Sequence, residues 1–324
     1  MIFVQDIRER AKRSDKKIVF PEGAEIRIQK AVEYLNKNNI LRCILLGNEH
    51  EIRGTATQNS VELGDVEILD PRESQHLDEF CDIYYELRKD KDIDREDAQA
   101  VMKKPIYFAA MMVRAGLADG SVAGSVSTTG EVLKAAIQII GMAPGISLVS
   151  STFEMVFQDN RVLTYADCAV VPNPDSEQLA DIAISSAKTH WRLTGEEPCV
   201  ALLSYSTKGS AEHPLVEKVQ QAVEIAKSKN PNLKIDGELQ GDAALVETVA
   251  ERKAPGSVVA GKANVLIFPD LNAGNIAYKL TERLASAKAM GPIIQGLDKP
   301  AHDLSRGCSW DDIVNVACIG SIMA

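Results

Sequence analysis

The sequence lacks the cysteine and histidine patterns that mark disulfide frameworks and metal centres. Its 324 residues include five scattered histidines and no CxxC pair. The six cysteines are equally dispersed: they are Cys43, Cys81, Cys168, Cys199, Cys308 and Cys318. This usage predicts reduced, buried thiols in a cytoplasmic protein rather than a disulfide framework. The spacing indicates neither a bound metal nor a Ser-His-Asp triad.

Targeting signals, long apolar runs and excess positive charge are also missing. The first residues, Met1–Asp6, have neither the basic start nor the apolar core of a secretory signal peptide. No apolar run approaches the roughly 20 residues that cross a bilayer. The net charge of -10 argues against nucleic acid or an anionic membrane as a partner. A small anionic substrate is still compatible, because a local arginine cluster can outweigh a distant negative surface.

The common nucleotide-binding motifs are absent. No G-x-G-x-x-G occurs, so the sequence has no standard dinucleotide fingerprint. The segment Gly256–Ala263 nearly fits a P-loop, but Ala263 stands where a magnesium-binding Ser or Thr is required. The segment also precedes a predicted strand instead of following one. We therefore expect a surface turn there and no ATP hydrolysis.

Short β-branched runs alternate with helical patterns along most of the chain, which is typical of an α/β protein with mostly parallel strands. The strands we expect are 17–20, 41–47, 66–71, 118–124, 200–204 and 265–269. The helices we expect are one ending near Asn38, 75–90, 95–116, one from Thr129, 176–194, 214–229 and 274–288. The turn-like Gln158–Asn160 between the runs 146–151 and 161–165 predicts a hairpin.

Glycine and proline divide the chain into two parts. The length predicts two domains, and Gly141–Gly145 is the clearest linker. A second break falls at Gly291–Gly296, and the segment after it is too short to form a domain. We therefore expect a discontinuous domain 1, residues 1–145 plus 296–324, and an inserted domain 2, residues 146–295.

Two predicted strands end in hydroxyl-rich loops. Gly124–Gly130 opens a helix, and Tyr205–Ser210 follows the strand at 200–204. Ligands of open α/β sheets bind beyond the carboxyl ends of strands, where backbone N–H groups and hydroxyls can hold a phosphate. The structural alternative is helix capping and turn formation, which explains most such clusters.

The turn His302–Asp312 is chemically dense and leads into an apolar run. It holds a hydroxyl, a guanidinium, a thiol and carboxylates close to the end of the chain. Ser309 and Asp312 also match a capping box at a helix start, and this structural interpretation is favoured on composition alone. His302, Asp303 and Ser305 are too close together to form a triad.

Seven blocks, in order and nearly end to end, together resemble the phosphate acetyltransferase (phosphotransacetylase) family. The blocks are Phe20–Gly23, Asp119–Thr129, Ala166–Pro174, Tyr205–Ser210, Asp236–Ala244, Val265–Lys279 and Asp303–Gly307. The resemblance implies reversible acetyl transfer: acetyl-CoA plus phosphate gives acetyl phosphate plus CoA. It also implies a homodimer of chains with two α/β domains and a cleft between them, similar to isocitrate and isopropylmalate dehydrogenases. Coenzyme A is a substrate, and no cofactor is expected.

The resemblance also implies roles for individual residues. Asp312 would be the general base for the CoA thiol, Ser305 would orient that base or the thiol, and Arg306 would hold acetyl phosphate and the developing oxyanion. The residues assigned to the phosphoryl group are Ser127, Thr128, Thr129, Ser206 and Thr207.

Two further cations are assigned to CoA. Arg88 matches a family arginine implicated in CoA binding, although a solvated residue at a helix end is the structural alternative. Lys134 stands where relatives carry an arginine, so it keeps the charge but loses bidentate geometry, and weaker CoA binding is expected.

Several alternatives are open at this point. The thiolate of CoA can attack acetyl phosphate directly, which we favour, or Cys308 or Ser305 can first be acetylated. Arg306 beside Cys308 would favour the second route by lowering the thiol pKa. The runner-up activities are a phosphate butyryltransferase or other short-chain phosphate acyltransferase and a non-catalytic acyl-CoA-binding regulatory module. A metal-dependent dehydrogenase predicts acidic ligands and a nicotinamide site, which we cannot locate.

Overall fold

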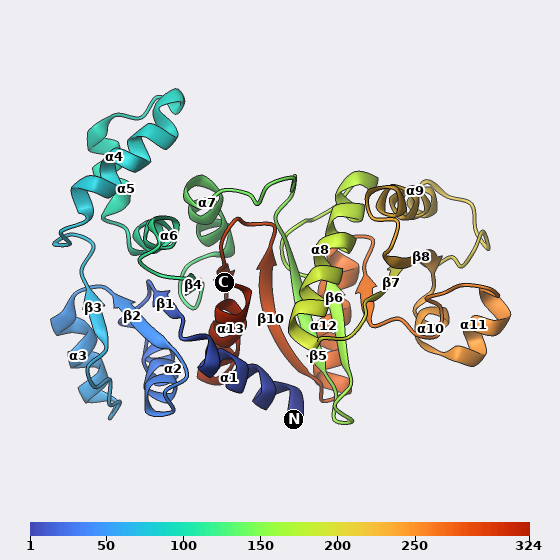
Figure 1. Cartoon of the computed structure of the whole chain (residues 1–324), viewed down its shortest axis with the longest axis horizontal. Helices are drawn as coiled ribbons and strands as arrows, with labels where there is room; N and C mark the ends of the chain where they lie inside the picture. Colours follow the sequence, from blue (N-terminus) through green and yellow to red (C-terminus); the bar gives the residue numbers. More distant parts are fainter. The chain divides into compact units, whose positions relative to one another are not determined.

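The chain folds into two compact units, described here by a computed structural model of all 324 residues. The terminal unit comprises Val4–Pro144 and Leu297–Ala324, and the central unit comprises Gly145–Gly296 with Met1–Phe3 (Figure 1). The end of the chain therefore returns to the unit that its first half builds.

The terminal unit contains a five-stranded, fully parallel sheet in the order β11-β4-β1-β2-β3. The strands are β1 (Lys17–Phe20), β2 (Arg42–Leu46), β3 (Glu67–Leu69), β4 (Gly120–Ala123) and β11 (Ala301–Asp303). The helices are α1 (Ile2–Ser14), α2 (Ile26–Lys37), α3 (Glu49–Gln58), α4 (Leu77–Arg88), α5 (Arg95–Met102), α6 (Pro105–Ala115), α7 (Thr129–Ile139) and α13 (Trp310–Met323), with a 3₁₀ turn, η1, at Lys89–Lys91.

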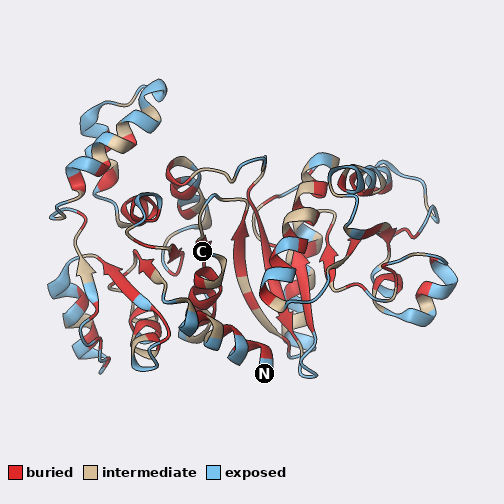
Figure 2. Cartoon of the chain, viewed as in Figure 1, coloured by how far each residue is buried: buried red, intermediate tan, exposed pale blue.

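Helices cover both faces of this sheet, so its strands are buried except for the edge strand β3 (Figure 2). Val19 and Ile44 pack with the apolar side chains of α6 and α7 on one face, while α2 and α13 lie on the other. Residues Ile106–Val113 of α6 are all buried, as expected for a helix that is apolar on every side. The pairing of β11 with β4 brings the C-terminal segment into the sheet, with Asp303 opposite Ala123.

The central unit contains a six-stranded sheet in the order β10-β5-β6-β9-β7-β8. The strands are β5 (Ser150–Val156), β6 (Val162–Ala166), β7 (Cys199–Leu203), β8 (Lys234–Leu239), β9 (Val265–Ile267) and β10 (Lys288–Gln295). The helices are α8 (Ser176–Thr194), α9 (Pro214–Lys229), α10 (Gly241–Leu245), α11 (Glu247–Lys253) and α12 (Leu271–Leu284). β6, β9, β7 and β8 run parallel, and β5 joins β6 in the predicted antiparallel hairpin. The predicted class, α/β with two mostly parallel sheets, is confirmed.

Some predicted elements were wrong in detail. The predicted single helix 95–116 is two helices, α5 and α6. Pro105 begins α6, and Lys104, the residue before this proline, has an extended backbone that interrupts the helix. Gly291 and Pro292 do not break the chain but lie inside β10, where the register with β5 shifts between Met290 and Ile293. Glycine and proline are tolerated there because a bulge interrupts the ladder.

No helix of the structure combines the length and apolarity needed to cross a membrane. No group of three or more His, Cys, Asp or Glu side chains is arranged to hold a metal ion.

Candidate active site

Three loops of the terminal unit leave the same edge of its sheet. They follow β1, β4 and β11, which are adjacent and parallel, so their carboxyl ends meet. The loops are 21–25, 124–128 and 304–309. The second and third carry most of the side chains that the sequence assigns to chemistry.

Glu22, in the loop after β1, binds the whole turn after β4. Its Oε2 accepts hydrogen bonds from the backbone N–H groups of Gly124 at 3.1 Å and Ser125 at 2.8 Å. Its Oε1 accepts from those of Val126 at 3.0 Å and Ser127 at 2.7 Å, and the Ser125 hydroxyl donates to Oε2. Burial acts to raise the pKa of Glu22, but these hydrogen bonds outweigh it and hold the pKa below its ordinary value.

Arg27 joins the loops after β4 and β11 through their backbone carbonyl groups. Its Nη2 donates to the Ser125 carbonyl at 2.8 Å, and its Nη1 donates to the carbonyls of Arg306 at 2.7 Å and Cys308 at 3.0 Å. Its Nε bonds the Glu25 carboxylate at 2.6 Å. One guanidinium therefore fixes the shape of two loops at once.

Asp303, the last residue of β11, is a buried carboxylate beside the same loops. Its Oδ2 accepts from Thr129 Oγ1 at 2.6 Å. Burial raises the pKa of Asp303 to about 6, and the nearby charge of Glu22 acts in the same direction. Gly124, with φ of +102°, lies directly against Asp303 and the Leu304 backbone.

The turn after β11 presents two exposed side chains of the predicted set. Ser305 Oγ accepts only from Gly307 N, at 3.3 Å, and the Arg306 guanidinium has no partner in the protein. Cys308 is buried, and burial raises the pKa of its thiol to about 11 although the Arg27 charge opposes this. The disfavoured acetyl-enzyme route relied on Arg306 to lower this pKa, but the arginine charge that acts on the thiol is that of Arg27, and desolvation outweighs it.

Asp312 occupies the third position of α13 and forms the predicted capping box with Ser309. Its Oδ2 accepts from Ser309 N at 2.9 Å and Ser309 Oγ at 2.8 Å, while its own N–H donates to that Oγ at 3.2 Å. Its Oδ1 has no partner in the protein. The neighbouring Asp311 is paired instead with Arg8 at 2.5 Å. One oxygen of Asp312 is therefore free to receive a proton.

Arg88 and Lys134 lie on two helices that pack together. Tyr84 of α4 donates from its hydroxyl to Gln138 of α7 at 3.1 Å. Arg88 ends α4 one turn beyond Tyr84, and Lys134 precedes Gln138 by one turn. Lys134 is exposed and Arg88 is half-buried, and neither forms an ion pair.

In the central unit, the loop after β7 is held by a carboxylate of β8. Ser206 is buried, and its hydroxyl donates to Glu238 Oε1 at 3.0 Å, while Gly209 N donates to the same oxygen at 2.7 Å. Thr207 is also buried and donates to Gln240 Oε1 at 3.2 Å. Both predicted hydroxyls therefore have partners within the protein.

The structure gathers Ser127, Thr128, Thr129, Ser305, Arg306 and Asp312 in the terminal unit, whereas Ser206 and Thr207 belong to the central unit. Sequence reasoning missed Glu22, Arg27 and Asp303 as members of this cluster. The Phe20–Gly23 block was recognised, but nothing in it showed which groups its acid would bind.

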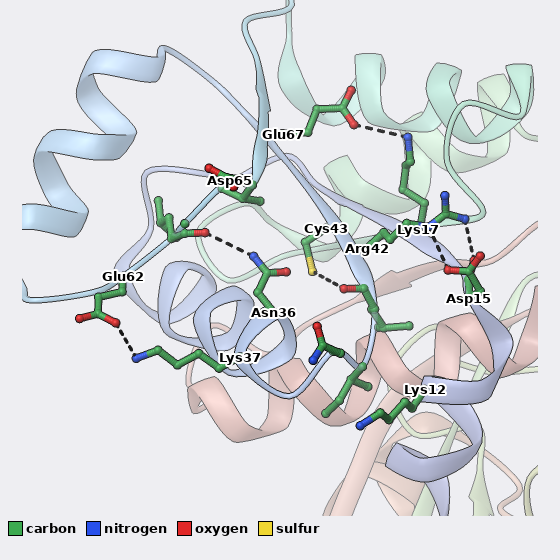
Figure 3. A pocket seen from close by; sticks show the side chains of 16 residues that line it. Lys12, Asp15, Lys17, Asn36, Lys37, Arg42, Cys43, Glu62, Asp65 and Glu67 are labelled. Atoms are coloured by element: carbon green, nitrogen blue, oxygen red, sulfur yellow. Dashed lines mark hydrogen bonds and ion pairs between the residues drawn. The ribbon is translucent and has the colours of Figure 1, made fainter.

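A cavity of about 860 Å³ opens at the opposite edge of the terminal sheet, at the amino ends of β1 and β2 (Figure 3). Three of its four cations are paired with carboxylates, Lys17 with Glu67 at 3.4 Å, Lys37 with Glu62 at 3.1 Å and Arg42 with Asp15 at 3.3 Å, and only Lys12 is unpaired. It therefore offers less positive charge to an anionic substrate than the edge that carries Arg306.

Known proteins match the chain over its full length. The family described as phosphate acetyl/butaryl transferase matches residues 2–321. The phosphate acetyltransferase of Thermoanaerobacterium thermosaccharolyticum is 53% identical, with 100% of both chains covered. That of Acetivibrio thermocellus is 51% identical and covers 100% of this chain and 98% of its own. A solved phosphotransacetylase from Streptococcus pyogenes has a TM-score of 0.94 and 42% identity, covering 99% of this chain and 97% of that one.

These matches place the chain in the transferase class of enzymes. It belongs to the phosphate acetyl/butaryl transferase family, and the resemblance in the sequence is confirmed.

Proposed function

We propose that this chain catalyses reversible transfer of an acetyl group between coenzyme A and phosphate, by direct attack of the CoA thiolate in a ternary complex. The observation that carries the proposal is that two polar groups near the start of α13 have no partner within the protein. The Arg306 guanidinium has no protein partner, and Oδ1 of Asp312 is equally unengaged. The names of the full-length relatives support the substrates.

Asp312 acts as the general base. A thiol of CoA is mostly protonated at neutral pH, so a nearby carboxylate must accept its proton before it attacks the acetyl carbonyl. Ser305 orients the thiol or the base from the adjoining turn. Arg306 binds acetyl phosphate and stabilises the oxyanion that forms at the carbonyl oxygen.

The phosphoryl group is held chiefly by the loop after β4. Ser127 and Thr128 supply hydroxyls there, next to the Arg306 turn that Arg27 ties to the same loop. Thr129, the first residue of α7, adds a hydroxyl that donates to Asp303 and offers its oxygen lone pairs. In the central unit, the hydroxyls of Ser206 and Thr207 bond Glu238 and Gln240 and shape the loop after β7, and their assignment to phosphate stays a prediction.

Arg88 and Lys134 bind phosphate groups of CoA. The contact between α4 and α7 supports this, because the two helices that carry these unpaired cations pack together. CoA and acetyl phosphate are the substrates, and the reaction needs no cofactor beyond them. We place the enzyme in the cytoplasm, with neither nucleic acid nor a membrane as partner, in keeping with its acidic composition.

We also propose that the enzyme is a homodimer. The support is an exposed apolar stripe on α12, where Ile276, Leu280 and Leu284 are 57%, 52% and 81% exposed at a spacing of four residues. Light scattering of wild type and Leu280→Asp tests this. A dimer that becomes monomeric in the variant supports the proposal, with Leu215→Asp on α9 as a matched control. A monomeric wild type contradicts it.

The activity is tested by measuring thioester formation from CoA with acetyl phosphate or butyryl phosphate. We expect acetyl transfer to be faster. Faster transfer with butyryl phosphate would change the substrate but keep the chemistry. Absence of transfer with both would favour an acyl-CoA-binding module.

A further inference from the structure

The loop that the sequence offers for phosphate already holds an anion. Four consecutive N–H groups, from Gly124 to Ser127, converge on the carboxylate of Glu22 at 2.7–3.1 Å. Converging backbone N–H groups of this kind form an anion-binding concavity. Here the anion is a side chain of the protein, and hydrogen bonds favour its charged form.

A related contact, with one backbone N–H in place of four, occurs in the central unit. Glu238 accepts from Gly209 N and from the Ser206 hydroxyl with one oxygen, and Gln220 donates to the other at 3.1 Å. Each of the two loops that the sequence predicts as phosphate sites is thus bound by a carboxylate from another segment, Glu22 after β1 and Glu238 in β8. Turn formation alone requires no such acid.

We propose that Glu22 is a positioning residue that permanently fills the amide concavity of residues 124–127 and keeps the substrate phosphate off these four amides. The phosphate is then bound by Arg306 and side-chain hydroxyls, at a loop whose shape Glu22 sets. This inference rests on the proposed function and deepens it. A cavity of about 430 Å³ lined by Glu22, Val126 and Ser127 opens to this position, so small ions can reach it.

The chemistry of substitution follows from the hydrogen-bond directions. Glu22→Gln offers one acceptor oxygen in place of two and turns an NH₂ donor toward N–H donors, so the loop loses its order. Glu22→Ala leaves the concavity empty and lined by unpaired donors, which a small carboxylate such as formate can fill. Glu131→Gln, an exposed charge change on the neighbouring helix α7, is the matched control.

The first test measures acetyl transfer by these variants with and without formate. We expect kcat of Glu22→Gln and Glu22→Ala to fall about tenfold or more while the KM for CoA changes less than about twofold. Formate restores much of the rate of Glu22→Ala, and chloride at equal ionic strength does not. Unchanged kcat, or equal effects of formate and chloride, would overturn the proposal. If Glu22→Ala does not fold, Glu22→Gln alone tests the proposal: a fall in kcat with little change in the KM for CoA supports it, and an unchanged kcat overturns it.

The second test is independent of activity and therefore separates this inference from the proposed function. Backbone amide resonances of Gly124–Ser127 are followed while inorganic phosphate is added. In wild type the amides of Gly124, Ser125 and Val126, which belong to residues not assigned to phosphate, stay in place, and in Glu22→Ala they shift on addition of phosphate or formate. Large phosphate-induced shifts of these amides in wild type would show that phosphate enters the concavity and would refute the inference, whether or not acetyl transfer occurs.

Discussion

Thr129 Oγ1 donates a hydrogen bond to Oδ2 of Asp303 at 2.6 Å, and this bond joins the first residue of α7 to the last residue of β11. α7 follows β4, and β4 pairs with β11 in the sheet although the two strands are far apart in the sequence. This bond and the hydrogen bonds of Glu22 and Arg27 hold the loop that carries Ser127 and the loop that carries Arg306 together in one polar cluster.

Asp303 makes the stability of the terminal unit depend on pH. Its pKa is raised from an ordinary 3.8 to about 6 by burial, so its contribution is fully present below pH 4 and is lost as the pH rises through 6. Asp303→Asn mimics the protonated acid, so its stability relative to wild type should rise by on the order of 2 kcal/mol between pH 4 and pH 7. Thermal unfolding at both pH values measures this. A difference that does not change with pH would contradict the assignment.

Gly124 is required for the approach of the loops after β4 and β11. A methyl group at this position would lie 2.8 Å from the Leu304 nitrogen and against the Asp303 carboxylate, at a φ of +102°. Gly124→Ala should therefore destabilise the protein by about 2 kcal/mol or more and reduce acetyl transfer. Gly130→Ala, where a methyl group meets nothing within 4 Å, is the control. Equal melting temperatures of the two variants would show that the contact is unimportant.

The cations of α4 and α7 should affect CoA and not acetyl phosphate. Lys134→Ala and Arg88→Ala are each expected to raise the KM for CoA about tenfold, because each loses a charge-assisted contact with phosphate. Lys134→Arg should lower it, since the guanidinium binds phosphate with two donors. Steady-state kinetics with each substrate varied in turn measures this. An unchanged CoA affinity in Lys134→Arg would refute the role of Lys134.

Cys308 should be dispensable for the chemistry. Its thiol is buried and its pKa is raised to about 11, so little thiolate exists at neutral pH. Cys308→Ala is expected to retain most of the acetyl-transfer rate. In addition, labelled phosphate should not exchange into acetyl phosphate when CoA is absent. Such exchange would establish a covalent acetyl-enzyme and exclude direct attack.

Local chemistry is what the sequence predicted well. The helices at 176–194 and 214–229 have the predicted bounds, and the Ser309–Asp312 capping box forms as its spacing indicates. Each depends on residues within a few positions of one another, where periodicity and side-chain capping determine the structure.

Contacts between distant segments could not be predicted in this way. Glu22 and Ser127 are 105 positions apart and meet only because β1 and β4 are neighbours in the sheet. The sequence did not predict β8, because Lys234, Asp236 and Glu238 interrupt the run of apolar residues that would indicate a buried strand. Two of these polar residues are buried in the structure and bond the Lys208 and Gly209 loop.

The central claim is that Asp312 removes the proton of CoA and does more than cap α13. Asp312→Asn keeps an amide oxygen for Ser309 N but removes the base, whereas Ser309→Ala removes the capping hydroxyl and keeps the carboxylate. The decisive measurement is the rate of thioester formation from acetyl phosphate and CoA by these two folded variants. We predict a loss of about 100-fold or more in Asp312→Asn and only a small loss in Ser309→Ala. Similar losses in both, or near wild-type activity of Asp312→Asn, would make Asp312 a helix cap and contradict the account.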